Sequence, residues 1–177
     1  MRKVVIVFGV MAFLSFLLSM VVCPGGYNPC LRMLSDLGRR TVAGVDFPPC
    51  HYLFVAGMVF ASFAVFFALK GWGGGICALG LLAIAAVPED VCAIGHNIGC
   101  HVATLGGVIA VVARMRSRFG RISAFVLFVV VVVFGACVAL HAVGFIPFAP
   151  AVPILQKLVI LFFAVWAVLQ LGYRQSH

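Results

Sequence analysis

Long apolar runs alternate with short polar segments along the whole chain. A helix needs about 20 mostly apolar residues to cross the hydrocarbon core of a bilayer. Six runs suit this role, the third being short and Gly-rich: residues 4–22, 52–69, 75–88, 97–113, 122–145 and 153–172. We therefore predict an all-α integral membrane protein, with residues 1–177 forming one bundle of six spans. The only long connection, residues 23–51, joins the first two spans.

Composition and charge support this class and give it an orientation. Hydrophobic residues make up 65% of the chain and charged residues 9%, against about half and a quarter in soluble domains. The net charge is +8. Basic residues flanking one side of the predicted spans account for much of it: Arg2, Lys3, Lys70, Arg114, Arg116, Arg118, Arg121 and Arg174. The positive-inside rule makes this side cytoplasmic, with both termini inside.

The same orientation places all four acidic residues outside: Asp36, Asp46, Glu89 and Asp90. Because the basic residues follow the membrane boundary, we expect contact with lipid headgroups and not with nucleic acid. We predict a multi-pass protein of the plasma membrane whose functional site faces the extracellular side. The polar segment Val87–His101, rich in histidine and cysteine, lies on that side.

Histidine and cysteine residues concentrate at this outer end. His51, His96, His101 and His141 all fall in the outer third of the predicted bundle. The dipeptide Cys-His occurs twice, as Cys50-His51 and Cys100-His101. In a c-type cytochrome, Cys-x-x-Cys-His bonds the haem through its thiols and ligates the iron through histidine. Here Phe47 and Asn97 replace the first cysteine, so each dipeptide is half of that signature.

Two such halves at one depth suggest a single haem held between two helices. In this hypothesis Cys50 and Cys100 provide thioether links, His51 and His101 are axial ligands, and His96 and His141 are alternate ligands. Arg39 or Arg40 would pair with the haem propionates. The function would be electron transfer or redox sensing, with a redox partner or a quinone exchanging the electrons.

Two other functions remain open. If residues 92–101 are helical, Cys92, His96 and Cys100 lie on one stripe and could hold zinc with Asp90 or His141. With Ser35 or Asp36 assisting, such a site would make the protein a metal-dependent hydrolase acting on a lipid. The second alternative is a lipid-binding bundle without catalysis. The chain has no Cys-x-x-Cys pair of the kind used in thiol–quinone chemistry, and a disulfide could join Cys23 to Cys30 within the first loop.

Several short motifs resemble those of DUF998, a family of six-helix membrane proteins of unknown function. The matching residues are Asn28, Pro29, Ser35, Asp36, Leu37, Gly38, Pro88, Glu89, Asp90 and His96. The resemblance implies the six-helix fold and an outward-facing polar cluster of Ser35, Asp36, Asp90 and His96, but no reaction. The two Cys-His dipeptides depart from the family pattern, which favours a cofactor peculiar to this chain.

Overall fold

The chain folds into long helices that lie side by side along one axis. The computed structural model describes residues 1–69, 71–113, 118–142 and 151–173, without some side chains of the last two helices. Helices make up 77% of the structure. The α-helices are α1 (Arg2–Val21), α2 (Pro49–Ala68), α3 (Trp72–Ala86), α4 (Ala93–Val112), α5 (Arg118–Ala142) and α6 (Ala151–Tyr173).

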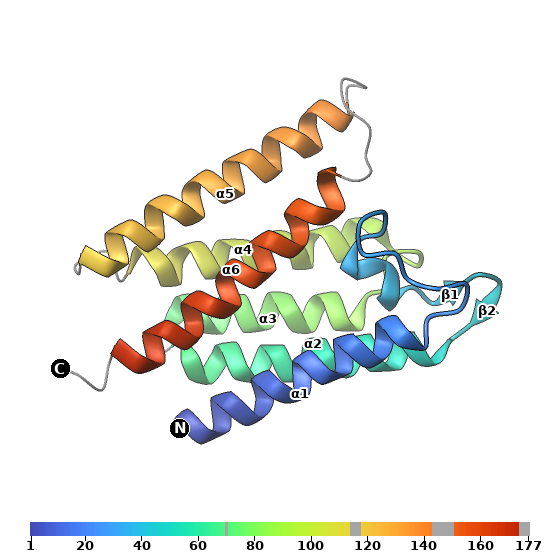
Figure 1. The fold of residues 1–177 in the computed structure, drawn as a ribbon, viewed down its shortest axis with the longest axis horizontal. Coiled ribbons are helices and arrows are strands. Elements are labelled where there is room, and N and C mark those ends of the chain that lie inside the picture. The colour runs from blue at the N-terminus through green and yellow to red at the C-terminus, as the bar shows by residue number, and fades with distance from the viewer. Residues whose placement is uncertain (70, 114–117, 143–150, 174–177) are drawn as a thin grey trace.

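Successive helices run in opposite directions along the long axis, so the start of α1 and the end of α6 lie at the same end (Figure 1). Each observed helix matches one predicted run to within a few residues. The predicted all-α architecture is therefore confirmed at the level of helices. By length and composition, α1, α2 and α4 are able to cross a membrane. The apolar stretches described in α3, α5 and α6 are shorter.

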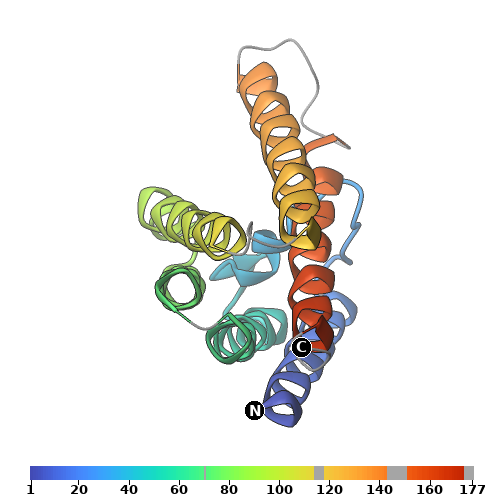
Figure 2. The same ribbon diagram turned by 90° about the vertical axis from the view of Figure 1, so that its left-hand side faces the viewer.

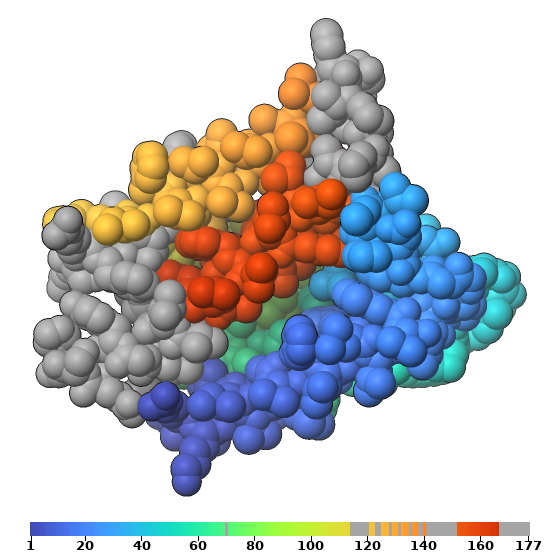
Figure 3. Space-filling model, viewed as in Figure 1, coloured from blue at the N-terminus to red at the C-terminus, as the bar shows by residue number. Residues whose placement is uncertain are grey.

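The connection between α1 and α2 folds over the opposite end of the bundle, which we call the loop end. It contains a short 3-10 helix, η1 (Leu34–Gly38), and a hairpin of β1 (Thr41–Val42) and β2 (Val45–Asp46). Seen along the bundle, η1 lies between the helices (Figure 2). The same connection packs against the start of α6 (Figure 3). There, the backbone N–H of Leu34 donates to Oε1 of Gln156 at 2.9 Å.

Small residues allow α3 and α4 to pack closely along their lengths. A Cβ atom added at Gly80 of α3 would collide with the backbone nitrogen of Ala103 on α4. At Gly73 it would come within 2.6 Å of the backbone nitrogen of Ala110. Close backbone approach through small residues is typical of helix pairs in membranes.

Among the side chains that the structure describes, the helices enclose two separate apolar clusters. One lies at the loop end and includes Leu37, Cys50, Phe54 and Ile84. The other lies toward the opposite end and includes Val5, Leu69, Val111 and Trp166. Because the first cluster joins η1 to α2 and α3, the position of the loop is fixed by the packing of the helices. This is the scaffold on which the polar groups of the loop end are placed.

Candidate functional site

The acidic residue of η1 closes its own helical turn. Asp36 accepts a hydrogen bond from the backbone N–H of Met33 through Oδ2 at 2.8 Å. Its Oδ1 pairs with Arg39 at 2.9 Å. The turn needs Gly38 at its end, because a Cβ atom there would collide with the ring of Phe54. Asp36 therefore both caps the turn and pairs with Arg39.

Asp90 fastens the hairpin to the turn between α3 and α4. Its two carboxylate oxygens accept the backbone N–H groups of Arg40 and Thr41, each at 2.9 Å. Burial by itself would raise the pKa of Asp90. Three backbone N–H groups, those of Arg40, Thr41 and Asp90 itself, and the positive charge of Arg39 favour the carboxylate. Together they outweigh the effect of burial and hold the pKa of Asp90 below its usual range. Asp90 is therefore held as a carboxylate with a structural task.

The first histidine of α2 is also held in place by the loop. His51 is buried, and its Nδ1 lies 2.9 Å from the carbonyl oxygen of Gly38, to which it donates. The rings of Phe47 and Tyr52 meet the imidazole edge to face at centroid distances of 5.7 and 5.4 Å. Phe47 has φ 46°, an uncommon value for a bulky residue, so the surrounding fold must hold this ring over His51.

His96 is the most enclosed polar side chain of the α3–α4 turn. It is 3% exposed, and its Nδ1 donates to the carbonyl oxygen of Val87 at 2.8 Å. Because Nδ1 carries the donated proton, the neutral tautomer of this ring has its lone pair on Nε2. Nε2 is shielded from solvent and has no hydrogen-bond partner among the residues that the structure describes. A buried acceptor left unpaired costs about 1–3 kcal/mol, so the group calls for an explanation.

Glu89 carries a second open acceptor at the same turn. Its Oε2 is buried without a hydrogen bond in the described part of the chain. The nearest opposite charge is Nη2 of Arg39 at 3.9 Å, beyond hydrogen-bond range. Glu89 also interacts electrostatically with Cys100, which lies one helical turn after His96. The two open acceptors, Oε2 of Glu89 and Nε2 of His96, therefore belong to residues only seven positions apart in the sequence.

The predicted stripe on α4 is confirmed only in part. Cys92 precedes the helix as its N-cap, where its sulfur accepts the N–H of Gly95 at 3.4 Å, and it is exposed. His96 is buried, Cys100 is half-buried, and His101 is exposed. His96 and His101 thus face different surroundings, as expected from the angle between them on a helix. Ser35 is half-buried in η1, and the side chain of His141 lies outside the described part of the structure.

Cys50 and Cys100 of the predicted haem site border the same apolar cluster at the loop end, whereas the two histidines differ in their surroundings. Cys50 has no exposed surface and belongs to the apolar cluster at the loop end, and His51 already binds the loop. His101 is exposed on α4, while α3 packs against both α2 and α4. Arg40 lies over the ring of Phe47, with its guanidinium carbon 4.8 Å from the centroid. These surroundings do not favour a haem held by both dipeptides, and the haem site stays an untested prediction.

The predicted zinc site likewise does not assemble from the described side chains. Among them, no three histidine, cysteine or acidic residues are arranged to hold a metal ion. Both carboxylate oxygens of Asp90, which was proposed as a ligand, already accept hydrogen bonds from backbone N–H groups. Zinc therefore remains a prediction without a ligand set in the described residues.

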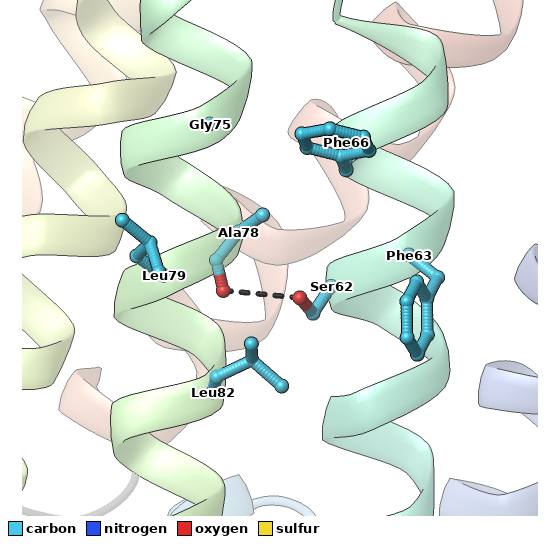
Figure 4. Close-up of a pocket in the computed structure, with 7 residues that line it drawn as sticks. All are labelled: Ser62, Phe63, Phe66, Gly75, Ala78, Leu79 and Leu82. Atoms are coloured by element: carbon cyan, nitrogen blue, oxygen red, sulfur yellow. Dashed lines mark hydrogen bonds between the residues drawn. The ribbon is translucent and has the colours of Figure 1, made fainter.

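A groove of about 330 Å³ lies between α2 and α3, away from this polar cluster. Its lining is almost wholly apolar, including Phe63, Phe66, Leu79 and Leu82 (Figure 4). The hydroxyl of Ser62 donates to the carbonyl oxygen of Ala78 at 3.0 Å. The groove therefore suits hydrocarbon and offers no reactive group.

Sequence reasoning identified His96 but did not single out Glu89 for the site. No local signal distinguishes Glu89 from Asp90, because only the fold shows which carboxylate is already satisfied. Comparison with protein-family models, with characterised proteins and with solved structures found no match. The resemblance to DUF998 accordingly stays a prediction, and the candidate site rests on its geometry.

Proposed function

We propose that the chain is a six-span plasma-membrane protein that binds a primary ammonium group at its extracellular end. The binding groups are Nε2 of His96 and Oε2 of Glu89. The observation that carries the proposal is the buried, unpartnered Nε2 of His96 in a cluster whose other polar groups are largely satisfied. No reaction is assigned to the site.

The six-span arrangement is supported by the directions of the helices and by the placement of charge. Arg2, Lys3 and Arg121 lie at the end of the bundle opposite the acidic residues of the loop end. Large apolar side chains such as Phe13, Leu79 and Leu161 are exposed on helix surfaces, which suits contact with lipid. The positive-inside rule then puts the loop end outside the cell.

The chemistry of the open groups selects the ligand class. Both open atoms accept hydrogen bonds, so the ligand must donate them. The guanidinium of Arg39 binds Asp36 at 2.9 Å and lies 3.9 Å from Oε2 of Glu89, so a cation at Oε2 would supply Glu89 with the close partner that it lacks. A primary ammonium group provides both donors and positive charge. Lipid headgroups such as phosphatidylethanolamine and soluble amines share this chemistry.

Lipid retention measured by native mass spectrometry tests the proposal on the detergent-purified protein. We expect phosphatidylethanolamine to be retained about tenfold more strongly than phosphatidylcholine, whose quaternary nitrogen has no N–H to donate. Competition by free ethanolamine would identify a soluble amine as the ligand. Equal retention of the two lipids, with no effect of ethanolamine, would contradict the proposal.

One substitution separates the open acceptor from the anchoring bond. The amide nitrogen of His96→Asn can take the place of Nδ1 and still donate to Val87, but no group replaces Nε2. We expect this variant to lose the preference for phosphatidylethanolamine while it remains folded. The matched control is His101→Asn, which changes an exposed histidine of the same helix and should retain the preference.

A further inference from the structure

Two cysteine side chains meet where the first loop begins and ends. Cys23 follows α1 and is 6% exposed, while Cys50 lies in the first turn of α2 and has no exposed surface. Both belong to the apolar cluster at the loop end. The Cys23 thiol lies close enough to Cys50 to act on it electrostatically. The structure contains both as free thiols.

The packing of α1 against α2 accounts for this meeting. The two helices run antiparallel, so the end of the first lies beside the start of the second (Figure 1). Ser19, one helical turn before Cys23, donates its hydroxyl to the carbonyl oxygen of Cys50 at 2.7 Å. This buried bond fixes the relative height of the two helices and sets the thiols at the same level.

The other thiols near the loop end lie in different surroundings. Cys30 and Cys92 are exposed, and Cys100 is half-buried on α4. The sequence allowed a bond between Cys23 and Cys30, but Cys23 is buried in the cluster that contains Cys50, and Cys30 is exposed. The pairing of cysteines cannot be deduced from sequence alone, and only the fold shows which of them share surroundings.

We propose that Cys23 and Cys50 form a disulfide bond that closes the first loop over the bundle. The inference rests on the proposed topology, because the loop end must face an oxidising compartment. Before the loop folds, the thiolate of Cys23 attacks a disulfide of an exchange-active donor and releases one donor thiol. The Cys50 thiolate then displaces the second donor thiol. The two cysteines lose two protons and two electrons, and the donor disulfide becomes a dithiol.

Peptide mapping of the full-length protein tests this bond. Free thiols are alkylated before the membranes are solubilised. The protein is then digested without reductant, and its peptides are analysed by mass spectrometry. We expect a linked peptide pair containing Cys23 and Cys50, with Cys30 and Cys92 alkylated. Reduction should also lower the melting temperature of the wild type by about 5 °C or more. The same treatment should have no such effect on Cys23→Ser, and Cys30→Ser should behave as the wild type.

Two results would overturn the proposal. One is a linked pair that joins Cys23 to Cys30. The other is an isolated protein in which Cys23 and Cys50 are not linked. A second experiment then shows whether the geometry or the proposed topology has failed. If oxidised glutathione links Cys23 to Cys50 in the purified protein, the geometry holds and the proposed topology is wrong. If it does not, the two thiols do not meet as described.

Discussion

Two histidines at the loop end are anchored in the same way. His51 and His96 each donate Nδ1–H to a backbone carbonyl, that of Gly38 and that of Val87. The bond of His51 joins α2 to η1 and so holds the loop in place. The bond of His96 spans only the turn before α4, and it leaves Nε2 enclosed without a partner among the described residues. The same type of bond therefore stabilises the fold at His51 and orients the proposed binding group at His96.

Acid should weaken the structure through Asp90. Its pKa is lower in the folded protein, so its stabilising contribution is complete above the unfolded value of about 4 and is lost as the pH falls through the folded value. Asp90→Asn should therefore cost about 1 kcal/mol of stability near neutral pH. Thermal unfolding in detergent across pH checks this. The gap between wild type and variant should narrow on acidification, and a gap that is constant with pH would contradict the assigned role.

The two Cys-His dipeptides lead to a spectroscopic prediction. Because Cys50 is enclosed in the apolar cluster and His101 is exposed on another helix, we expect no haem to be held between them. Protein expressed with haem available should show no Soret band when oxidised and no sharp α and β bands when reduced. A Soret band that survives in the wild type and disappears in Cys100→Ala would restore the haem hypothesis.

At the scale of elements, the close packing of α3 against α4 depends on glycines, which have no side chain. Gly80 brings the backbone of α3 against Ala103 of α4, whereas Gly75 of α3 has nothing within 4 Å of an added Cβ atom. Substituting each of these two glycines by alanine therefore separates the effect of helix propensity from the effect of packing against α4.

We expect Gly80→Ala to destabilise the protein by about 1–3 kcal/mol, because the helices must separate to admit the methyl group. Gly75→Ala should instead be neutral or stabilising by up to about 1 kcal/mol, since alanine favours a helix. Thermal unfolding of both variants in the same detergent measures the difference. Equal effects of the two substitutions would show that α3 and α4 do not pack through Gly80.

The elements were largely predictable from the sequence, and their polar contacts were not. Apolar length located all six helices. Local pattern could not show that Asp90 would bind the backbone of Arg40 and Thr41, because these residues are separated by two helices. Nor could it show that Cys23 and Cys50 would share one buried cluster while Cys30 is exposed. Such contacts depend on the relative heights at which helices pack, which bonds such as Ser19 to Cys50 determine.

At the scale of the whole molecule, the structure concentrates its polar chemistry at one end. Asp36, Arg39, Glu89, Asp90 and His96 come from the first loop, the α3–α4 turn and the start of α4. The helix surfaces between the ends expose large apolar side chains, and the groove beside α2 is apolar as well. A bundle of this kind can hold lipid chains along its sides, and we propose that it recognises a polar group at the loop end.

The nitrogen spectrum of His96 tests the central claim most directly. Protein labelled with ¹⁵N in histidine is placed in phosphatidylcholine nanodiscs and then in nanodiscs containing phosphatidylethanolamine, or is given ethanolamine, with His96→Asn used to assign the resonance. We predict that the Nε2 resonance of His96 shifts toward that of a hydrogen-bonded acceptor when a primary ammonium group is supplied, while the Nδ1 resonance remains that of a bonded N–H. An Nε2 resonance that is unchanged by both the lipid and the free amine would contradict the proposed binding site.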